Sequence, residues 1–139
     1  MSAFVPFDCF ALDLGLKKHN LSTDVLKIYL TDVAPDPATD TVYGTPADLA
    51  TSGGYTSGGS SLGANTWTQF AGLAALVAGA NVVFTATSGF GPFRYVILYN
   101  FTAAAKNLIG YWDNGSEVTL AAAQTFEVDF SPQVLTLEF

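Results

Sequence analysis

Apolar residues occupy both alternating sets of positions in residues 91–100, "GPFRYVILYN". If this segment is a strand, the odd-numbered positions from 93 to 99 are all aromatic or aliphatic and point to one side. Val96 and Leu98 point to the other side, between Arg94 and Asn100. A half-buried strand normally has one polar face. The pattern therefore predicts that a second layer of the same chain, or a neighbouring molecule, covers each side of this strand.

Short segments with strand-like patterns recur along the chain. Residues 125–131 alternate most regularly, with Phe126, Val128 and Phe130 on one face and polar residues on the other. Turn-forming residues between two strand-like arms predict a hairpin at residues 113–115. The predicted strands are residues 25–31, 66–70, 73–78, 82–87, 93–100, 108–112, 118–120, 125–131 and 134–138. About eight short strands in one domain, residues 1–139, predict an all-β, jelly-roll-like β-sandwich.

One helix and one long loop complete the predicted organisation. Residues 7–18 carry apolar side chains at helical spacing, with Asp8 early and two lysines late, as the helix dipole favours. Residues 34–61 are dense in Pro, Gly, Ser, Thr and Asp and predict a long loop, in which Pro46 could begin a single helical turn. The glycine-rich residues 52–61 predict a flexible part of this loop. Tyr55 is a candidate contact residue within this loop.

Few charges are available to hydrate the surface. The chain is 50% hydrophobic and only 12% charged, with a net charge of −7, and the charged fraction is about half that of an average soluble domain. The longest weakly polar run, residues 71–84, contains Asn81 and falls short of the ~20 residues that a membrane-spanning helix needs. Five scattered cations argue against binding to nucleic acid. We therefore expect a subunit that uses much of its surface in protein contacts.

The N-terminal region and the cysteine content favour synthesis in a reducing cytosol. The first ten residues have no basic lead and carry Asp8, which is not typical of a secretory signal. Cys9 is the single cysteine, so no internal disulfide is expected.

Residue types that could support catalysis are present only in isolation. His19 lies in the polar stretch "KKHN", which favours a solvated helix end over a general base. Cys9 is expected to be a buried structural thiol. Glu127 and Asp129 share one strand face, as alternation predicts for any wet face, and this explains them better than glycosidase chemistry does. Residues 113–117 do not match a calcium-loop spacing. We expect no enzyme, no cofactor and no metal site.

The remaining candidates are contact residues. Trp67 and Phe70 are more typical of a core than of a binding platform. Arg94 could pair with a carboxylate of its own chain or of a neighbour, or extend over tyrosine rings at the sheet edge. The candidate subunit-interface residues are Arg94, Val96, Leu98, Trp67, Phe70 and Tyr55.

Several stretches together resemble a family of small tailed-bacteriophage virion proteins. The stretches are the "LKIYL" strand, the loop "TVYGTPADL" with the following "GYTSGG", "GPFRYVILYN" and "LIGYWDNG". The resemblance extends from about Phe7 to about Leu137 and is weakest over residues 62–79, which are rich in Ala and Leu.

The resemblance implies a structural component of the virion. Several members of the family resemble jelly-roll decoration, or cement, subunits of the capsid, and their motifs contain no catalytic residues. The implied partners are the major capsid protein and further copies of the chain, as a dimer or trimer, on the capsid surface of a phage made in a bacterial cytoplasm. The alternative is a tail or receptor-binding component whose loop at residues 34–61 contacts the host surface.

Overall fold

The computed structural model describes residues 1–138, without the side chain of Phe70, and it is mainly β-structure with one short helix. The largest sheet has five strands in the order β1-β8-β7-β2-β3, and each hydrogen-bonded pair is antiparallel. Its strands are β1 (Val5–Pro6), β2 (Leu26–Thr31), β3 (Ser60–Ser61), β7 (Gly89–Asn100) and β8 (Leu108–Ala121). The all-β prediction with one N-terminal helix is confirmed.

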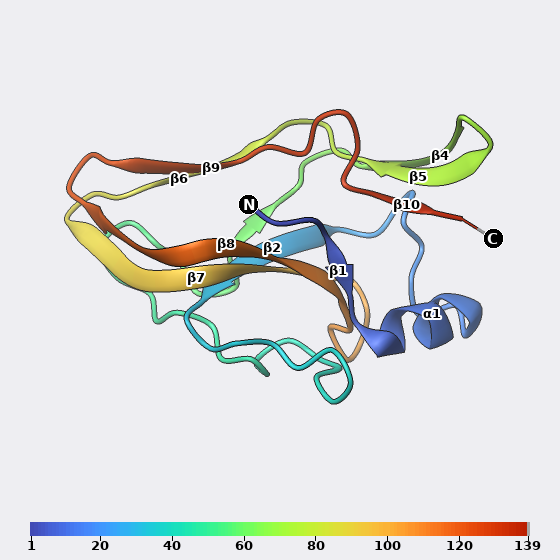
Figure 1. Ribbon diagram of the computed structural model, residues 1–139, viewed down its shortest axis with the longest axis horizontal. Coiled ribbons are helices and arrows are strands. Elements are labelled where there is room, and N and C mark those ends of the chain that lie inside the picture. Colours follow the sequence, from blue (N-terminus) through green and yellow to red (C-terminus); the bar gives the residue numbers. More distant parts are fainter. Residues whose placement is uncertain (139) are drawn as a thin grey trace.

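Two small sheets form a second layer over one face of the large sheet (Figure 1). One has the order β10-β5-β4, and the other pairs β6 with β9. Their strands are β4 (Thr66–Phe70), β5 (Leu73–Val77), β6 (Val82–Thr85), β9 (Thr125–Val128) and β10 (Leu135–Leu137). The chain between β2 and β3 crosses the opposite face of the large sheet, and helix α1 (Asp8–Gly15) lies at one end.

Strand β7 separates two hydrophobic cores. Val96 and Leu98 point into the larger core, beneath the two small sheets. Ile97 and Tyr99 point into a smaller core, which is covered by Tyr43 of the segment between β2 and β3. The same chain therefore covers both faces of the strand, and this explains why "FRYVILYN" is apolar on both sides.

The predicted hairpin at residues 113–115 is wrong, because β8 is one continuous strand through this region. Tyr95 pairs with Asp113 and Phe93 pairs with Val118, so β8 has extra residues opposite a single position of β7. The Asp113 side chain accepts the Gly115 N–H at 2.7 Å and closes a local turn. The turn residues thus form a bulge, after which β8 continues in the same direction.

The other predicted elements agree more closely with the structure. Residues 125–131 alternate as predicted, with Val128 and Phe130 buried and the polar positions exposed. The predicted strand at residues 73–78 forms as β5, which ends one residue earlier, at Val77. The helix is shorter than predicted, at Asp8–Gly15. The predicted helical turn after Pro46 does not form, because this segment is held in an irregular path along the sheet.

Candidate functional site

The predicted subunit-interface residues do not form one surface. Val96 and Leu98 are 0% exposed and Tyr55 is 2% exposed. The interface prediction is wrong for these three, because their side chains fill the core of their own chain. Trp67 is half-buried and borders a shallow pocket on the β4–β5 hairpin, so its interface role stays a prediction. The Phe70 side chain lies outside the described part of the structure.

Arg94 pairs with a carboxylate of its own chain. Its Nε lies 2.8 Å from Oδ1 of Asp113 and its second amino nitrogen lies 3.1 Å from Oδ2, so the contact is bidentate. Hydrogen bonding to Arg94 holds the pKa of the Asp113 carboxyl below its usual value. The guanidinium also lies 5.4 Å from the Tyr95 ring centre. Arg94 therefore fixes the bulge of β8 against β7, and both groups remain partly exposed.

Asp48 organises the long segment between β2 and β3. Its carboxylate accepts hydrogen bonds from the hydroxyls of Tyr43 at 2.7 Å, Tyr55 at 2.5 Å and Ser57 at 3.2 Å, and from the Gly58 N–H at 2.5 Å. Burial and the bond to Asp48 raise the pKa of the Tyr55 phenol, which therefore stays protonated as a donor. A carboxylate with this many donors is a strong local anchor.

Two glycines allow this segment to lie directly on the backbone of the strands. A Cβ added to Gly59 would lie 1.7 Å from the Ile28 carbonyl oxygen, and one added to Gly53 would lie 1.7 Å from the Gly89 carbonyl oxygen. Only glycine permits such an approach. The predicted long loop is confirmed, because no helix or strand of the sheets lies between β2 and β3. Its glycine-rich stretch is held against the strands at Gly53 and Gly59, so the prediction that this stretch is flexible is wrong. The signal in the sequence was the combination of Asp48 with nearby tyrosines and paired glycines.

His19 is part of a buried polar network. Its ring is 7% exposed, so the prediction of a solvated helix end is wrong. Nδ1 lies 3.0 Å from the Asn100 amide nitrogen, which also donates to Asp24 at 2.7 Å. Burial lowers the pKa of the His19 imidazole. The negative charges of Asp13 and Asp24 act in the opposite direction, but their effect is smaller. The network ties the chain after α1 to the end of β7.

One end of the molecule has a surface without charged side chains. Residues 49–93 contain no Asp, Glu, Lys, Arg or His, and neither do residues 118–126. Three exposed turns from these stretches meet: the Thr87 N–H donates to the Gly53 carbonyl, and the Ala86 N–H donates to the Gln124 carbonyl. We call this surface the uncharged end, and its exposed residues are Ala50, Thr51, Ser52, Gly54, Thr85, Thr87, Ser88 and 121–125.

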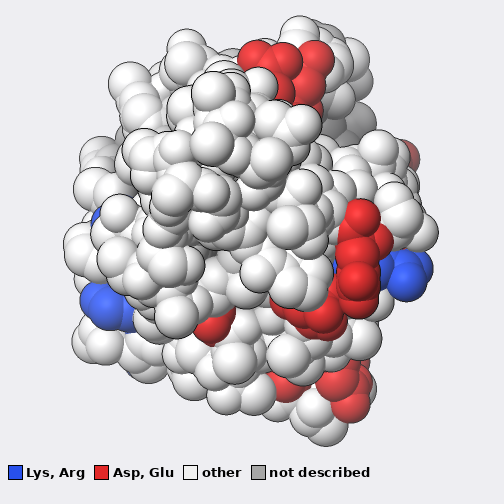
Figure 2. Space-filling view, turned by 90° about the vertical axis from the view of Figure 1, so that its left-hand side faces the viewer, with Lys and Arg blue, Asp and Glu red and all other residues white. Residues whose placement is uncertain are grey.

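The uncharged end lies on the left in Figure 1 and faces the viewer in Figure 2. The broad centre of that face is formed by residues that are neither acidic nor basic (Figure 2). A chain with a net charge of −7 places its acidic groups elsewhere. The uncharged end shares one property with the centres of protein interfaces, the depletion of Lys, Asp and Glu, which makes it a candidate contact surface.

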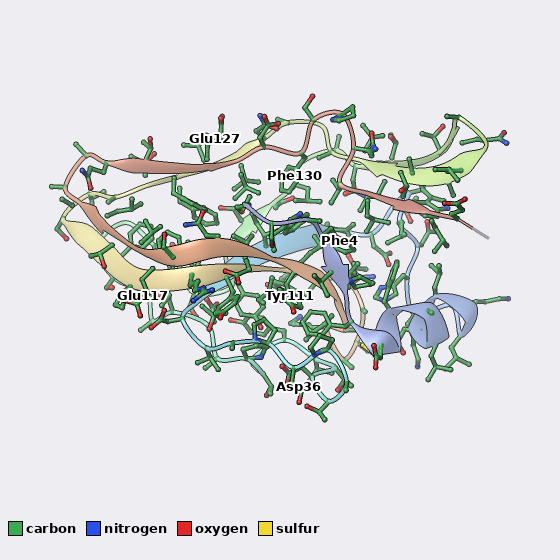
Figure 3. The ribbon with its side chains drawn as sticks, in the orientation of Figure 1. Phe4, Asp36, Tyr111, Glu117, Glu127 and Phe130 are labelled. Atoms are coloured by element: carbon green, nitrogen blue, oxygen red, sulfur yellow. The ribbon has the colours of Figure 1, made fainter. Side chains whose placement is uncertain are left out.

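A cavity of about 390 Å³ opens beside β9. Its lining residues are Met1, Ser2, Trp112, Asn114, Phe126, Glu127 and Asp129. In Figure 3, Phe130 points into the space between the two layers, and Glu127 points away from that space. The two carboxylates therefore occupy the outer positions that the alternation of β9 assigns to polar side chains. Among the described residues, the lining has no His, Cys, Lys or Arg to combine with them.

Cys9 is a half-buried free thiol on α1. Its Sγ lies 3.7 Å from the Leu108 carbonyl oxygen. Burial, aided by the negative charge of Asp13, raises the pKa of the thiol to about 11. Within residues 1–138, no three His, Cys, Asp or Glu side chains are grouped so as to hold a metal ion. The same residues contain no helix of the length and hydrophobicity needed to cross a membrane.

Comparisons of the chain with known protein families, with curated proteins and with solved structures each found no match. The functional argument therefore depends on the geometry described above and on the sequence motifs. In the described structure, the uncharged end is a candidate surface for contact with another protein.

Proposed function

We propose that this chain is a structural protein of a tailed-bacteriophage virion, and that it decorates the outside of the capsid and stabilises it. The motifs that resemble small phage virion proteins support the proposal. In the structure these motifs have a structural purpose, because Asp48 and Tyr55 anchor the long segment and Gly59 lets it lie on β2. Residues that fix the path of the backbone suit a subunit whose role is structural.

The observation that carries the proposal is the uncharged end. Exposed Thr, Ser and Gln side chains can meet another protein at moderate cost if their polar groups find hydrogen-bond partners there, whereas buried unpaired charges cost several kcal/mol. The acidic remainder of the surface would keep bound subunits hydrated and prevent their nonspecific association. We infer that this end contacts the major capsid protein at the capsid surface, after synthesis in the bacterial cytoplasm.

The proposed role is consistent with a particular type of β-fold. We infer a jelly-roll-like β-sandwich, and the support for it is the stacking of two small antiparallel sheets on the five-stranded sheet.

Decoration would stabilise the capsid through the binding free energy of the decoration protein. A protein that binds the assembled shell better than the separated capsid subunits adds this free energy to the stability of the shell at every site. Even about 2 kcal/mol per site becomes large over many sites.

The test is to prepare virions that lack this protein and to heat them beside complete virions. Release of DNA at a lower temperature, with normal adsorption to cells, is the expected result, and re-addition of the purified protein should restore the release temperature. Loss of adsorption at an unchanged release temperature would contradict the capsid role and support a tail or receptor-binding component. Counting copies per particle by mass spectrometry separates the two roles independently, because a decoration protein is present in many copies.

A further inference from the structure

Helix α1 and the residue that follows it expose two leucines. Leu12 is 63% exposed and Leu16 is 58% exposed, which makes them the most exposed of the large apolar side chains in the described structure. Leu16 is the residue that follows α1, and its N–H donates to the Leu12 carbonyl at 3.0 Å, so it continues the helix side that carries Leu12. The two side chains form a short ridge. An exposed apolar ridge is costly in a chain that is poor in charges, unless another surface covers it.

An apolar groove runs beside this ridge. It has a volume of about 320 Å³ and is lined by Ala11, Leu14 and Gly15 of α1 and by Leu137 of β10. Ala11 and Gly15 are also four residues apart, and a Cβ added to Gly15 would meet no atom within 4 Å. The helix thus carries a ridge of large side chains and a groove along small ones, side by side on its exposed surface.

Charges at the two ends of α1 are complementary to each other. Asp8 is exposed at the first turn, and Lys17 and Lys18 are exposed just after the last turn. None of the three forms a salt bridge with another residue in the described part of the chain. When two such helices pack antiparallel, the acidic end of each meets the basic end of the other, and the helix dipoles are also opposed favourably.

We propose that α1 is the two-fold contact of a homodimer. In a two-fold contact the same surface is used twice, so it must be complementary to itself. The ridge of Leu12 and Leu16 on one copy would fill the groove along Ala11 and Gly15 on the other. By symmetry, the ridge of the second copy would fill the groove of the first. Asp8 would face the lysine pair of the partner at both ends. A second copy is the occupant that satisfies the apolar and the charged features together. This proposal does not depend on the capsid role.

The position of α1 leaves the rest of the molecule free. Figure 1 places α1 at the right-hand end of the long axis and the turns of the uncharged end at the left-hand end. The small area that one short helix can offer predicts a weak dimer, since stable interfaces bury more than about 1,000 Å² in total. We therefore expect an equilibrium that depends on protein concentration.

The first experiment measures mass against concentration by sedimentation equilibrium, for the full chain and for Leu12→Glu. Val83→Glu is the matched control, because Val83 is 49% exposed but lies on β6, away from α1. The expected result is a dimer whose dissociation constant rises at least tenfold in Leu12→Glu and is unchanged in Val83→Glu. A wild-type chain that remains monomeric up to about 1 mM would overturn the proposal, as would equal effects of the two substitutions. Circular dichroism would verify that each variant is folded.

A charge exchange tests the antiparallel arrangement. Asp8→Lys alone, and Lys17→Asp combined with Lys18→Asp, should each weaken self-association, because each change creates two repulsive contacts in its own homodimer. An equimolar mixture of the two variants should recover dimers, since both contacts of the mixed dimer are attractive. The recovery should diminish as the salt concentration rises. A mixture that stays as monomeric as its components would contradict the antiparallel contact.

Discussion

The phenol oxygen of Tyr55 lies 2.5 Å from Oδ1 of Asp48 and donates a hydrogen bond to it. The same oxygen accepts the backbone N–H of Leu30 at 3.0 Å. One buried side chain thus connects the anchor of the long segment to strand β2. The covering of the smaller core depends on this connection, because Tyr43 is also bonded to Asp48.

Asp48→Ala should destabilise the fold by about 3 kcal/mol, because the buried Tyr55 hydroxyl and three less buried donors lose a charged acceptor. Asp32→Ala is the control, since Asp32 is exposed and precedes the same segment, and it should change the free energy of unfolding by less than about 0.5 kcal/mol. Urea-induced unfolding monitored by tryptophan fluorescence measures both. A loss below about 1 kcal/mol for Asp48→Ala would mean that the segment is held mainly by its apolar contacts.

Gly59→Ala should be far more damaging than Gly63→Ala. Both glycines have a positive φ, 74° and 77° respectively, so the conformational cost of alanine is similar. At Gly59 the new methyl would lie 1.7 Å from a backbone oxygen, whereas at Gly63 it would meet nothing within 4 Å. We expect a loss of about 1 kcal/mol for Gly63→Ala and more than about 3 kcal/mol, or failure to fold, for Gly59→Ala. Thermal unfolding of the two variants provides the comparison, and equal losses would refute the close approach.

The stability of the fold should fall as the pH decreases from about 7 toward 5. Burial lowers the pKa of His19 in the folded chain, so the unfolded chain, with an ordinary pKa of about 6.5, binds a proton first. As the pH falls below about 6.5, protonation of His19 in the unfolded chain therefore lowers the free energy of unfolding, until His19 of the folded chain is protonated as well. Above about pH 6.5 His19 is neutral in both states and does not affect stability. His19→Gln should flatten the dependence of unfolding free energy on pH in this window. Parallel profiles for the two proteins would show that other groups cause the change.

Cys9 should react slowly with thiol reagents in the folded protein. A pKa of about 11 leaves little thiolate at pH 8. The expected rate with an aromatic disulfide reagent at pH 8 is at least tenfold below the rate for the same chain in denaturant, and it should still be rising at pH 10. Equal rates in the folded and unfolded states would mean that the thiol is accessible and unperturbed.

A charge placed on the uncharged end should weaken attachment to the capsid without changing stability. Thr87→Lys introduces a cation on this surface, while Ala104→Lys introduces one in the exposed turn between β7 and β8. Rebinding to depleted virions should fall at least tenfold for Thr87→Lys and stay near the wild-type level for Ala104→Lys. Attachment of the wild type should persist in moderate salt, because an uncharged contact is screened little. Normal rebinding by Thr87→Lys would exclude this end as the contact surface.

Local patterns predicted the strands better than they predicted what surrounds them. The alternation of residues 125–131 identified both faces of β9 correctly, since period-two burial is a local property. Residues 113–115 suit a hairpin and a bulge equally well, and only the pairing with β7 decides between them. The two-sided apolar pattern at Val96 and Leu98 required a cover on each face. It could not identify that cover as the polar segment held by Asp48, because this depends on contacts between distant parts of the chain.

The placement of α1 and the uncharged end at opposite ends of the long axis has a consequence for valency. Two copies joined through α1 would direct their uncharged ends away from each other, so the dimer would be bivalent, with one binding surface at each end. Once one surface is attached, the second searches only a small volume, and its effective concentration is set by the distance between the two surfaces. Two individually weak contacts would then give a long residence time wherever two sites lie at the distance between the two uncharged ends, and only brief attachment elsewhere. Selectivity for a regular lattice would follow from spacing alone.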